Sequence, residues 1–308
     1  MIVKLTYTTT TKEEKHVKFS KEVEMVKLGE ENIEHIDLTP LSPCTKLEYI
    51  ELGENQIQNI DLTPLSSCES LQNLNLNGNQ LQEIDLTPLS SCSELNYLKL
   101  NNNKLQTIDL NPLRSCQKFE GLRLEGNQLG NIDLTPLGSI PALLEIKLDD
   151  NQLKAINLSP LNSCTALRWL HLNNNQIQTI DLSPLGACAL NRLDLKNNQI
   201  KTIDVTPLSH CSHTMEHPFE KDHVLTLPIF QELLLDGNQI ESIDLTPLGS
   251  CDNLKYLSLR GNRLQTIDLK PLSSCSYLMI VDLSENNFET IDFSPLNDRV
   301  EVRYGSNQ

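Results

Sequence analysis

Apolar residues recur at fixed places in a unit of about 24 residues, which is repeated eleven times along the chain. The unit that begins at Leu47 reads Leu47-x-x-Ile50-x-Leu52-x-x-Asn55-x-Ile57-x-x-Ile60-Asp61-Leu62-Thr63-Pro64-Leu65-x-x-Cys68. The units begin at equivalent apolar residues: Val23, Leu47, Leu71, Leu95, Phe119, Leu143, Leu167, Leu190, Phe230, Leu254 and Leu278. Such a period is typical of a solenoid, in which each unit buries its apolar face only by stacking on a neighbour.

The order of residues within one unit predicts a strand, a turn and a short helical segment. The alternation in Ile50-x-Leu52 favours a half-buried strand that lies parallel to its counterparts in the neighbouring units. Asn55 follows, at a turn where its amide can bond main-chain groups. Thr63 and Pro64 are typical of a helix start, with Thr as the N-cap, and the helical turn should extend to Cys68.

The pattern Leu-x-x-Leu-x-Leu-x-x-Asn-x-Leu resembles that of leucine-rich repeat proteins. The continuation Ile-Asp-Leu-Thr-Pro-Leu is similar to the Asp-Ile-Ser-Pro-Leu run of internalin-type and phosphatase-regulator-type repeats, which occur in intracellular bacterial and archaeal proteins. The resemblance covers roughly residues 23–296 and implies an α/β solenoid. This would be a horseshoe of eleven repeats, with a parallel concave strand ribbon and short helical or 3-10 turns on the convex side. It also implies protein binding and carries over no catalytic residue.

The interruptions of the period indicate how the chain is organised. Residues 1–22 lack the repeat and alternate as a β-hairpin would, so we expect an N-terminal cap. The repeat array then covers residues 23–298. The spacing rises from 24 to 40 residues between Leu190 and Phe230, which indicates a 16-residue insertion at about 212–227. Residues 299–308 are expected to supply a C-terminal capping strand.

Composition and charge exclude some classes of function. The 308 residues are 38% hydrophobic and carry a formal net charge of −16, which argues against unaided binding to nucleic acid or to an anionic membrane. No apolar run approaches the roughly 18 residues that a transmembrane helix needs. The first residues are too polar for a secretory signal, so we expect the protein to lie in the cytoplasm. We also expect it to be a monomer. No residue pattern requires a cofactor.

All nine cysteines occupy one position of the repeat, and Ile140 fills the same position in the fifth unit. An apolar substitute indicates an interior site, so we expect buried, reduced thiols. Disulfides are disfavoured because parallel side chains suit the required dihedral angle poorly. The cysteines are Cys44, Cys68, Cys92, Cys116, Cys164, Cys188, Cys211, Cys251 and Cys275.

Ten aspartates form a second column, and Asn157 occupies the remaining place. Stacked carboxylates repel one another unless cations or main-chain donors compensate, which leaves two hypotheses. One is a ladder of calcium ions, and the other is a main-chain hydrogen bond to each side chain beside the helix start. Asn157 favours the second, because an amide oxygen accepts such a bond without a charge.

The insertion and its flank hold His210, His213, His217 and His223 close to Cys211. His213 and His217 would share one face of a helix, so a zinc site with His213, His217 and His223 as weak candidates is one hypothesis. A solvated loop and a loop that contacts a partner are the alternatives.

The outward positions of the predicted strands are where the units differ most. In the middle repeats they bring together aromatic and basic residues, which are the types that anchor interfaces. These candidate binding residues are Tyr97, Lys99, Arg123, Lys147, Arg168, Trp169 and His171. The alternative is that they are ordinary solvated strand residues.

No catalytic triad and no phosphate-binding loop is present, so we expect a non-catalytic scaffold that binds a protein partner through its concave strands. The alternatives are the repeat arm of a larger signalling protein, linked to a GTPase or a ligase, and a metal-binding or enzymatic activity at the His-rich loop 210–223.

Overall fold

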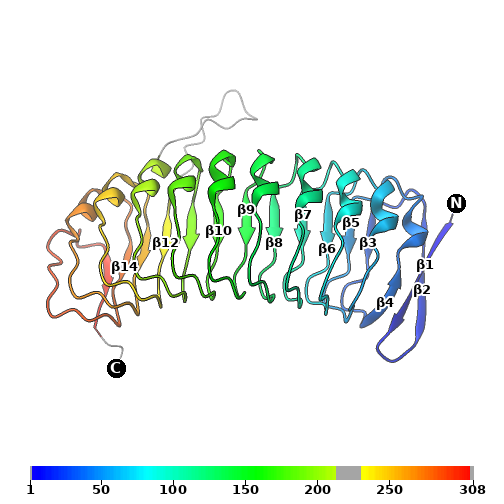
Figure 1. Cartoon of the computed structure of the whole chain (residues 1–308), viewed down its shortest axis with the longest axis horizontal. Helices are drawn as coiled ribbons and strands as arrows, with labels where there is room; N and C mark the ends of the chain where they lie inside the picture. The colour runs from blue at the N-terminus through cyan, green and yellow to red at the C-terminus, as the bar shows by residue number, and fades with distance from the viewer. Residues whose placement is uncertain (1, 213–229, 306–308) are drawn as a thin grey trace. The chain divides into compact units, whose positions relative to one another are not determined.

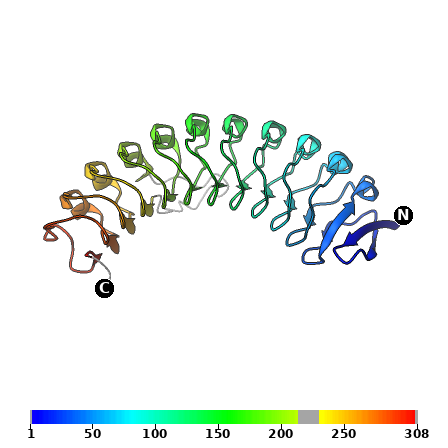
Figure 2. The ribbon, with the colours of Figure 1, turned by 60° about the horizontal axis from the view of Figure 1, so that its bottom comes forward.

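The computed structural model describes residues 2–212 and 230–305. The chain divides into two compact units, Met1–Gln152 and Leu153–Gln308. In each unit the repeats stack side by side, with strands on one side of the stack and short helical turns on the other (Figures 1 and 2). The predicted solenoid architecture with short 3-10 turns is therefore confirmed within each unit.

The first unit begins with a three-stranded antiparallel sheet in the order β2-β1-β4. Its strands are β1 (Ile2–Thr9), β2 (Glu14–Ser20) and β4 (Ile33–Asp37). Alternate residues Val3, Leu5 and Tyr7 of β1 are buried, as the period-2 pattern requires. The sequence predicts a hairpin that covers the first strand of the array. In the structure β1 and β2 form the hairpin, and the other edge of β1 pairs with β4, the extended segment that follows the first turn.

The parallel strands are three residues long, and the middle residue of each is buried except in the last strand, where Val302 is partly exposed. Those of the first unit are β3 (Met25–Lys27), β5 (Tyr49–Glu51), β6 (Asn73–Asn75), β7 (Tyr97–Lys99), β8 (Gly121–Arg123) and β9 (Glu145–Lys147). Those of the second unit are β10 (Trp169–His171), β11 (Arg192–Asp194), β12 (Glu232–Leu234), β13 (Tyr256–Ser258), β14 (Ile280–Asp282) and β15 (Glu301–Arg303). The register keeps equivalent residues side by side, as in the pair Leu74 and Leu98.

Ten 3-10 helices lie on the side opposite the strands in the described residues. In the first unit they are η1 (Thr39–Leu41), η2 (Thr63–Ser67), η3 (Thr87–Ser91), η4 (Asn111–Ser115) and η5 (Thr135–Ser139). In the second they are η6 (Ser159–Ser163), η7 (Ser183–Ala187), η8 (Thr206–Ser212), η9 (Thr246–Ser250) and η10 (Lys270–Ser274). The last repeat forms only a turn at Ser294 and Pro295. Within the described part of the chain, no helix is long and apolar enough to cross a membrane.

The helix starts differ from the prediction in one respect. Thr63 is the first residue of η2, and Leu62 occupies the N-cap position. The Leu62 side chain makes no capping hydrogen bond. The stabilising bond comes from Asp61, whose Oδ1 accepts the Thr63 N–H at 2.8 Å. Lys270, which lacks a hydroxyl, donates the same main-chain bond to Asp268 at 2.9 Å. The prediction of Thr as the N-cap was therefore wrong, because the free N–H belongs to Thr and the acceptor lies two residues earlier.

The asparagine column bonds main-chain groups in neighbouring rungs, as the sequence predicts. The Asn79 amide donates to the carbonyl oxygens of Leu52 at 2.9 Å and Leu76 at 3.1 Å. Its Oδ1 accepts the Ile57 N–H at 3.0 Å. These bonds satisfy main-chain groups that the tight turn would otherwise leave buried without a partner.

The cysteine column lies inside the stack, as predicted, and all nine cysteines are buried thiols that form no disulfide. Several thiols donate to a leucine carbonyl of the preceding rung, as Cys92 does to Leu65 at 3.6 Å. Burial raises the pKa of the Cys92 thiol to about 12. Ile140, at the equivalent position, is buried as well, so the column is an apolar part of the core.

Candidate functional site

The outward-pointing first and third residues of the parallel strands form a surface that we call the strand face. The candidate residues Tyr97, Lys99, Arg123 and Lys147 lie on the strand face of the first unit, on β7, β8 and β9. In the second unit, Trp169 and His171 lie on β10, and Arg168 directly precedes that strand.

Tyr97 lies across Gly121 on the neighbouring strand. A Cβ atom at residue 121 would come within 2.5 Å of the Tyr97 ring, so only glycine leaves room for this arrangement. The Tyr97 hydroxyl donates to Glu120 at 2.8 Å. Burial, together with that carboxylate, raises the pKa of Tyr97 to about 12. Tyr97 is therefore held in place as a neutral aromatic group at neutral pH.

Glu145 holds two of the candidate basic residues. Its carboxylate lies 3.1 Å from the Arg123 guanidinium and 2.9 Å from the Lys147 Nζ. Burial alone would raise the pKa of Glu145, but the hydrogen bond from Lys147 and the charge of Arg123 outweigh it and lower the pKa. The positive charge that Arg123 and Lys147 offer to a partner is therefore partly neutralised within the protein.

Trp169 is the most exposed candidate in the second unit, with 37% of its surface accessible. Its neighbour on β11 is Arg192, whose guanidinium lies 3.0 Å from Asp194 and 2.9 Å from Glu232. Asp194 is buried and also lies 3.5 Å from the Lys196 Nζ. Trp169 thus borders a network of charges that are already paired.

The sequence analysis did not single out the carboxylates Glu120, Glu145, Asp194 and Glu232. The sequence did contain a signal for Glu145, since the 24-residue register pairs Gly121 with Glu145 and Arg123 with Lys147 on two adjacent strands, which brings Glu145 diagonally close to Arg123. Glu125 was missed as well. Its Oε2 is buried without a hydrogen-bond partner in the described structure, and burial raises the pKa of the side chain.

The aspartate column binds main-chain groups, as the second hypothesis stated. Each of the ten aspartates from Asp37 to Asp292 accepts a bond from the N–H two residues later, such as that from Thr87 to Asp85 at 2.8 Å. Asn157 accepts the equivalent bond from Ser159 at 3.0 Å without a charge. Hydrogen bonds from the side chain and main chain of Thr87 lower the pKa of Asp85. These donors compensate the negative charge of the carboxylates.

The three weak zinc candidates His213, His217 and His223 lie outside the described residues. His210 is exposed at the end of η8, where its ring nitrogen lies 3.2 Å from the Ser209 hydroxyl. Across residues 2–212 and 230–305, no group of three or more His, Cys, Asp or Glu side chains could hold a metal ion.

Comparison with known protein families identifies the class of protein. The sequence model described as "Leucine rich repeat" matches residues 21–81, 69–129 and 228–288. The model described as "Leucine Rich repeats (2 copies)" matches residues 165–210. The chain belongs to the leucine-rich repeat family. No curated protein matches the sequence.

Solved structures with the same fold include two internalins of Listeria monocytogenes. The functional domain of InlJ, described as including a cysteine ladder, is 19% identical with a TM-score of 0.60; the match covers 93% of this chain and 64% of that one. InlF is 25% identical with a TM-score of 0.56, and the match covers 93% and 89%. A chain of the LRIM1/APL1C complex is 19% identical with a TM-score of 0.63, and the match covers 92% and 51%. This chain therefore spans about two thirds or less of two of these structures.

Proposed function

We propose that the chain is a non-catalytic scaffold that binds a protein partner through its strand face, with Trp169 as the main anchor. The observation that carries the proposal is the 37% exposure of this large aromatic side chain on β10, directly before the fully buried Leu170. Tryptophan is among the residues most enriched at the energetic centres of interfaces. The membership of the chain in a family of repeat scaffolds supports the same role.

The rigidity of the strands is the physical basis of the proposed binding. Main-chain bonds to the neighbouring strand hold the segment of Trp169, since the N–H groups of Asn191 and Arg192 both donate to the Arg168 carbonyl. A side chain presented from such a strand loses little conformational freedom when a partner binds. Tryptophan and tyrosine also supply a large contact area with few rotatable bonds.

The paired charges close to Tyr97 in the first unit suggest how a partner would be selected. A carboxylate of a partner would compete with Glu145 for Arg123 and Lys147 rather than meet free cations. Replacement of the Glu145 ion pairs by ion pairs to the partner favours a partner whose carboxylates are correctly placed, and it adds little non-specific attraction. We therefore expect salt to weaken binding, and an acidic protein surface is the class of partner that we propose.

The test compares the wild-type protein with a Trp169→Ala variant in affinity capture from the source lysate. The affinity of each recovered partner is then measured. Loss of a buried tryptophan anchor costs about 2 kcal/mol or more, so we expect binding to weaken by roughly thirtyfold or more. Met25→Ala is the matched control, because Met25 is an exposed apolar residue on β3, in the other unit. A partner that binds Trp169→Ala as tightly as the wild type would refute Trp169 as the anchor.

A further inference from the structure

Exposed apolar side chains gather near the end of the second unit. Six large apolar residues are exposed in the described part of the chain, and three of them are Tyr277, Met279 and Tyr304. Tyr304 packs against Phe293 in a tilted arrangement, with ring centroids 4.7 Å apart. Tyr277 and Met279, exposed by 60% and 59%, have no such cover. Single exposed apolar residues are ordinary, but a cluster of them indicates a binding surface.

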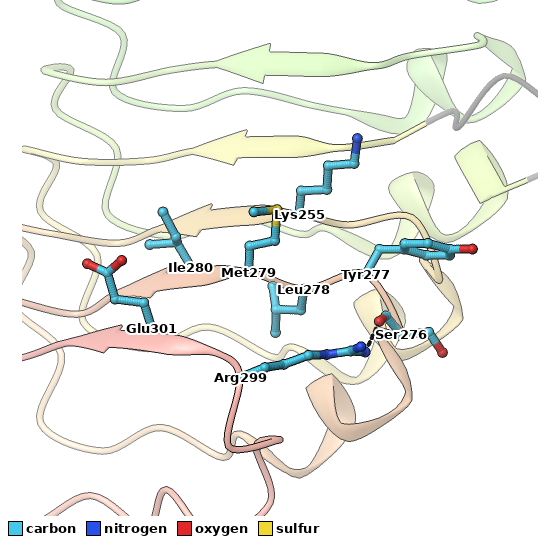
Figure 3. A pocket seen from close by; sticks show the side chains of 8 residues that line it. All are labelled: Lys255, Ser276, Tyr277, Leu278, Met279, Ile280, Arg299 and Glu301. Carbon is cyan, nitrogen blue, oxygen red and sulfur yellow. Dashed lines mark hydrogen bonds between the residues drawn. The ribbon is translucent and has the colours of Figure 1, made fainter.

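Tyr277 and Met279 line a pocket of about 440 Å³ where the chain enters β13, β14 and β15 (Figure 3). Leu278 and Ile280 complete its apolar lining. Main-chain bonds fix the positions of these side chains. The Lys255 carbonyl accepts the N–H groups of Met279 at 2.9 Å and Ile280 at 3.1 Å, and the Met279 carbonyl accepts the Glu301 N–H at 2.8 Å. The pocket is therefore built on rigid strands and has the volume of a ligand site.

Two cations border this apolar pocket. Lys255 extends from the start of β13 and Arg299 from the segment before β15, on opposite sides of Met279 (Figure 3). Neither forms an ion pair within the described residues. The Arg299 guanidinium donates to the Ser276 carbonyl, and Glu301 is already held by Arg303 at 2.7 Å. By contrast, Arg192, which lies beside Trp169, is paired with the buried Asp194 and with Glu232.

We propose that this pocket binds an extended segment of a partner protein in which a large apolar side chain lies next to one or two carboxylates. The apolar side chain would be buried against Met279, Leu278 and Tyr277, and the carboxylates would reach Lys255 and Arg299. Charge complementarity favours this occupant, because both available charges at the pocket are positive. A second copy of this chain fits less well, because two molecules of net charge −16 repel each other at long range.

A peptide selection tests the proposal directly. A display library of random dodecapeptides is selected on the immobilised full chain, and enriched peptides are synthesised with a fluorescent label for anisotropy. We expect the enriched sequences to combine a large apolar residue with Asp or Glu. Lys255→Glu and Met279→Ser should each weaken their binding by roughly tenfold or more, the effect of losing one interface anchor.

Matched controls separate this pocket from other surfaces. Lys201→Glu makes the same charge change at an exposed lysine of the same unit, and Met25→Ser removes an exposed methionine elsewhere. Both should bind the peptides as the wild type does. Trp169→Ala should do so too, which makes this test independent of the proposed role of Trp169. Thermal unfolding of every variant checks that the fold is intact.

Three outcomes would overturn the proposal. The first is a selection that enriches no peptides with both apolar and acidic residues. The second is peptide binding that survives both Lys255→Glu and Met279→Ser. The third is self-association of the wild-type chain in sedimentation velocity that Met279→Ser abolishes, which would identify a second copy as the occupant.

Discussion

Asn79 illustrates how one side chain links successive rungs. Its amide and carbonyl make hydrogen bonds to the main chain of the rung before it, at Leu52 and Ile57, and to its own rung at Leu76. The residue is buried, so water cannot replace these bonds when the side chain is removed. The same geometry recurs at the other asparagines of the column and ends at Asn286, which is only partly buried.

We predict that Asn79→Ala lowers the free energy of unfolding by about 1–3 kcal/mol, the usual effect of leaving buried polar groups unsatisfied. Urea unfolding followed by circular dichroism measures this change. Asn286→Ala is the control and should lower stability less, because water reaches the groups that it exposes. Equal losses of unfolding free energy in the two variants would show that burial does not determine how much each asparagine contributes to stability.

The start of each 3-10 helix depends on an aspartate that accepts main-chain bonds. Hydrogen bonds from the side chain and main chain of the residue two positions later lower the pKa of Asp61, Asp85 and Asp133. A carboxyl whose pKa is lower in the folded state stabilises the fold at any pH above its unfolded value, which is about 3.9 for Asp. That stabilisation disappears as the pH falls through the folded pKa.

We therefore predict acid sensitivity that comes from this column. The urea midpoint of the wild-type protein should change little between about pH 7 and pH 5 and fall below about pH 4. A triple variant with Asp61→Asn, Asp85→Asn and Asp133→Asn should lose less stability over the same acid range, since Asn157 already makes this bond without a charge. If the two proteins lose stability equally, other carboxyl groups are responsible.

At the scale of the whole molecule, the strands on either side of the predicted insertion pair directly with each other. Strand β11 pairs directly with β12, so Leu193 lies beside Leu233 although 40 residues separate them. The Asn238 amide donates to the Leu195 carbonyl at 2.9 Å, although 43 residues separate the two. The predicted insertion at 212–227 lies almost entirely outside the described residues, yet the rungs on either side of it are in register.

We predict that deletion of residues 212–227 changes the melting temperature of the full chain by only a few degrees, a range that corresponds to about 1 kcal/mol or less. Differential scanning calorimetry measures the change. Replacement of the same residues by a Gly/Ser segment of equal length controls for the shortened connection. A large drop in both proteins would mean that a side chain of the insertion packs into the core.

The sequence alone determined the repeat, its strands and turns, and the buried columns of leucine, asparagine and cysteine. This was possible because, in a stack, residues one period apart in sequence are neighbours in space. The repeat pattern of the sequence therefore predicts which residues contact each other in the folded protein. The candidate residues on the strand face could be named for the same reason, since outward positions follow from the period-2 alternation.

The tertiary structure decided what the outward side chains do. It showed that Glu145 pairs with Arg123 and Lys147. It also showed that Lys255 and Arg299 border an apolar pocket, and that neither is paired with a carboxylate of residues 2–212 or 230–305. These outcomes depend on side-chain rotamers and on competition between neighbouring charges, neither of which the repeat pattern specifies. It also decided the pairing of β1 with β4, because the period is broken there and sequence spacing no longer predicts which segments meet.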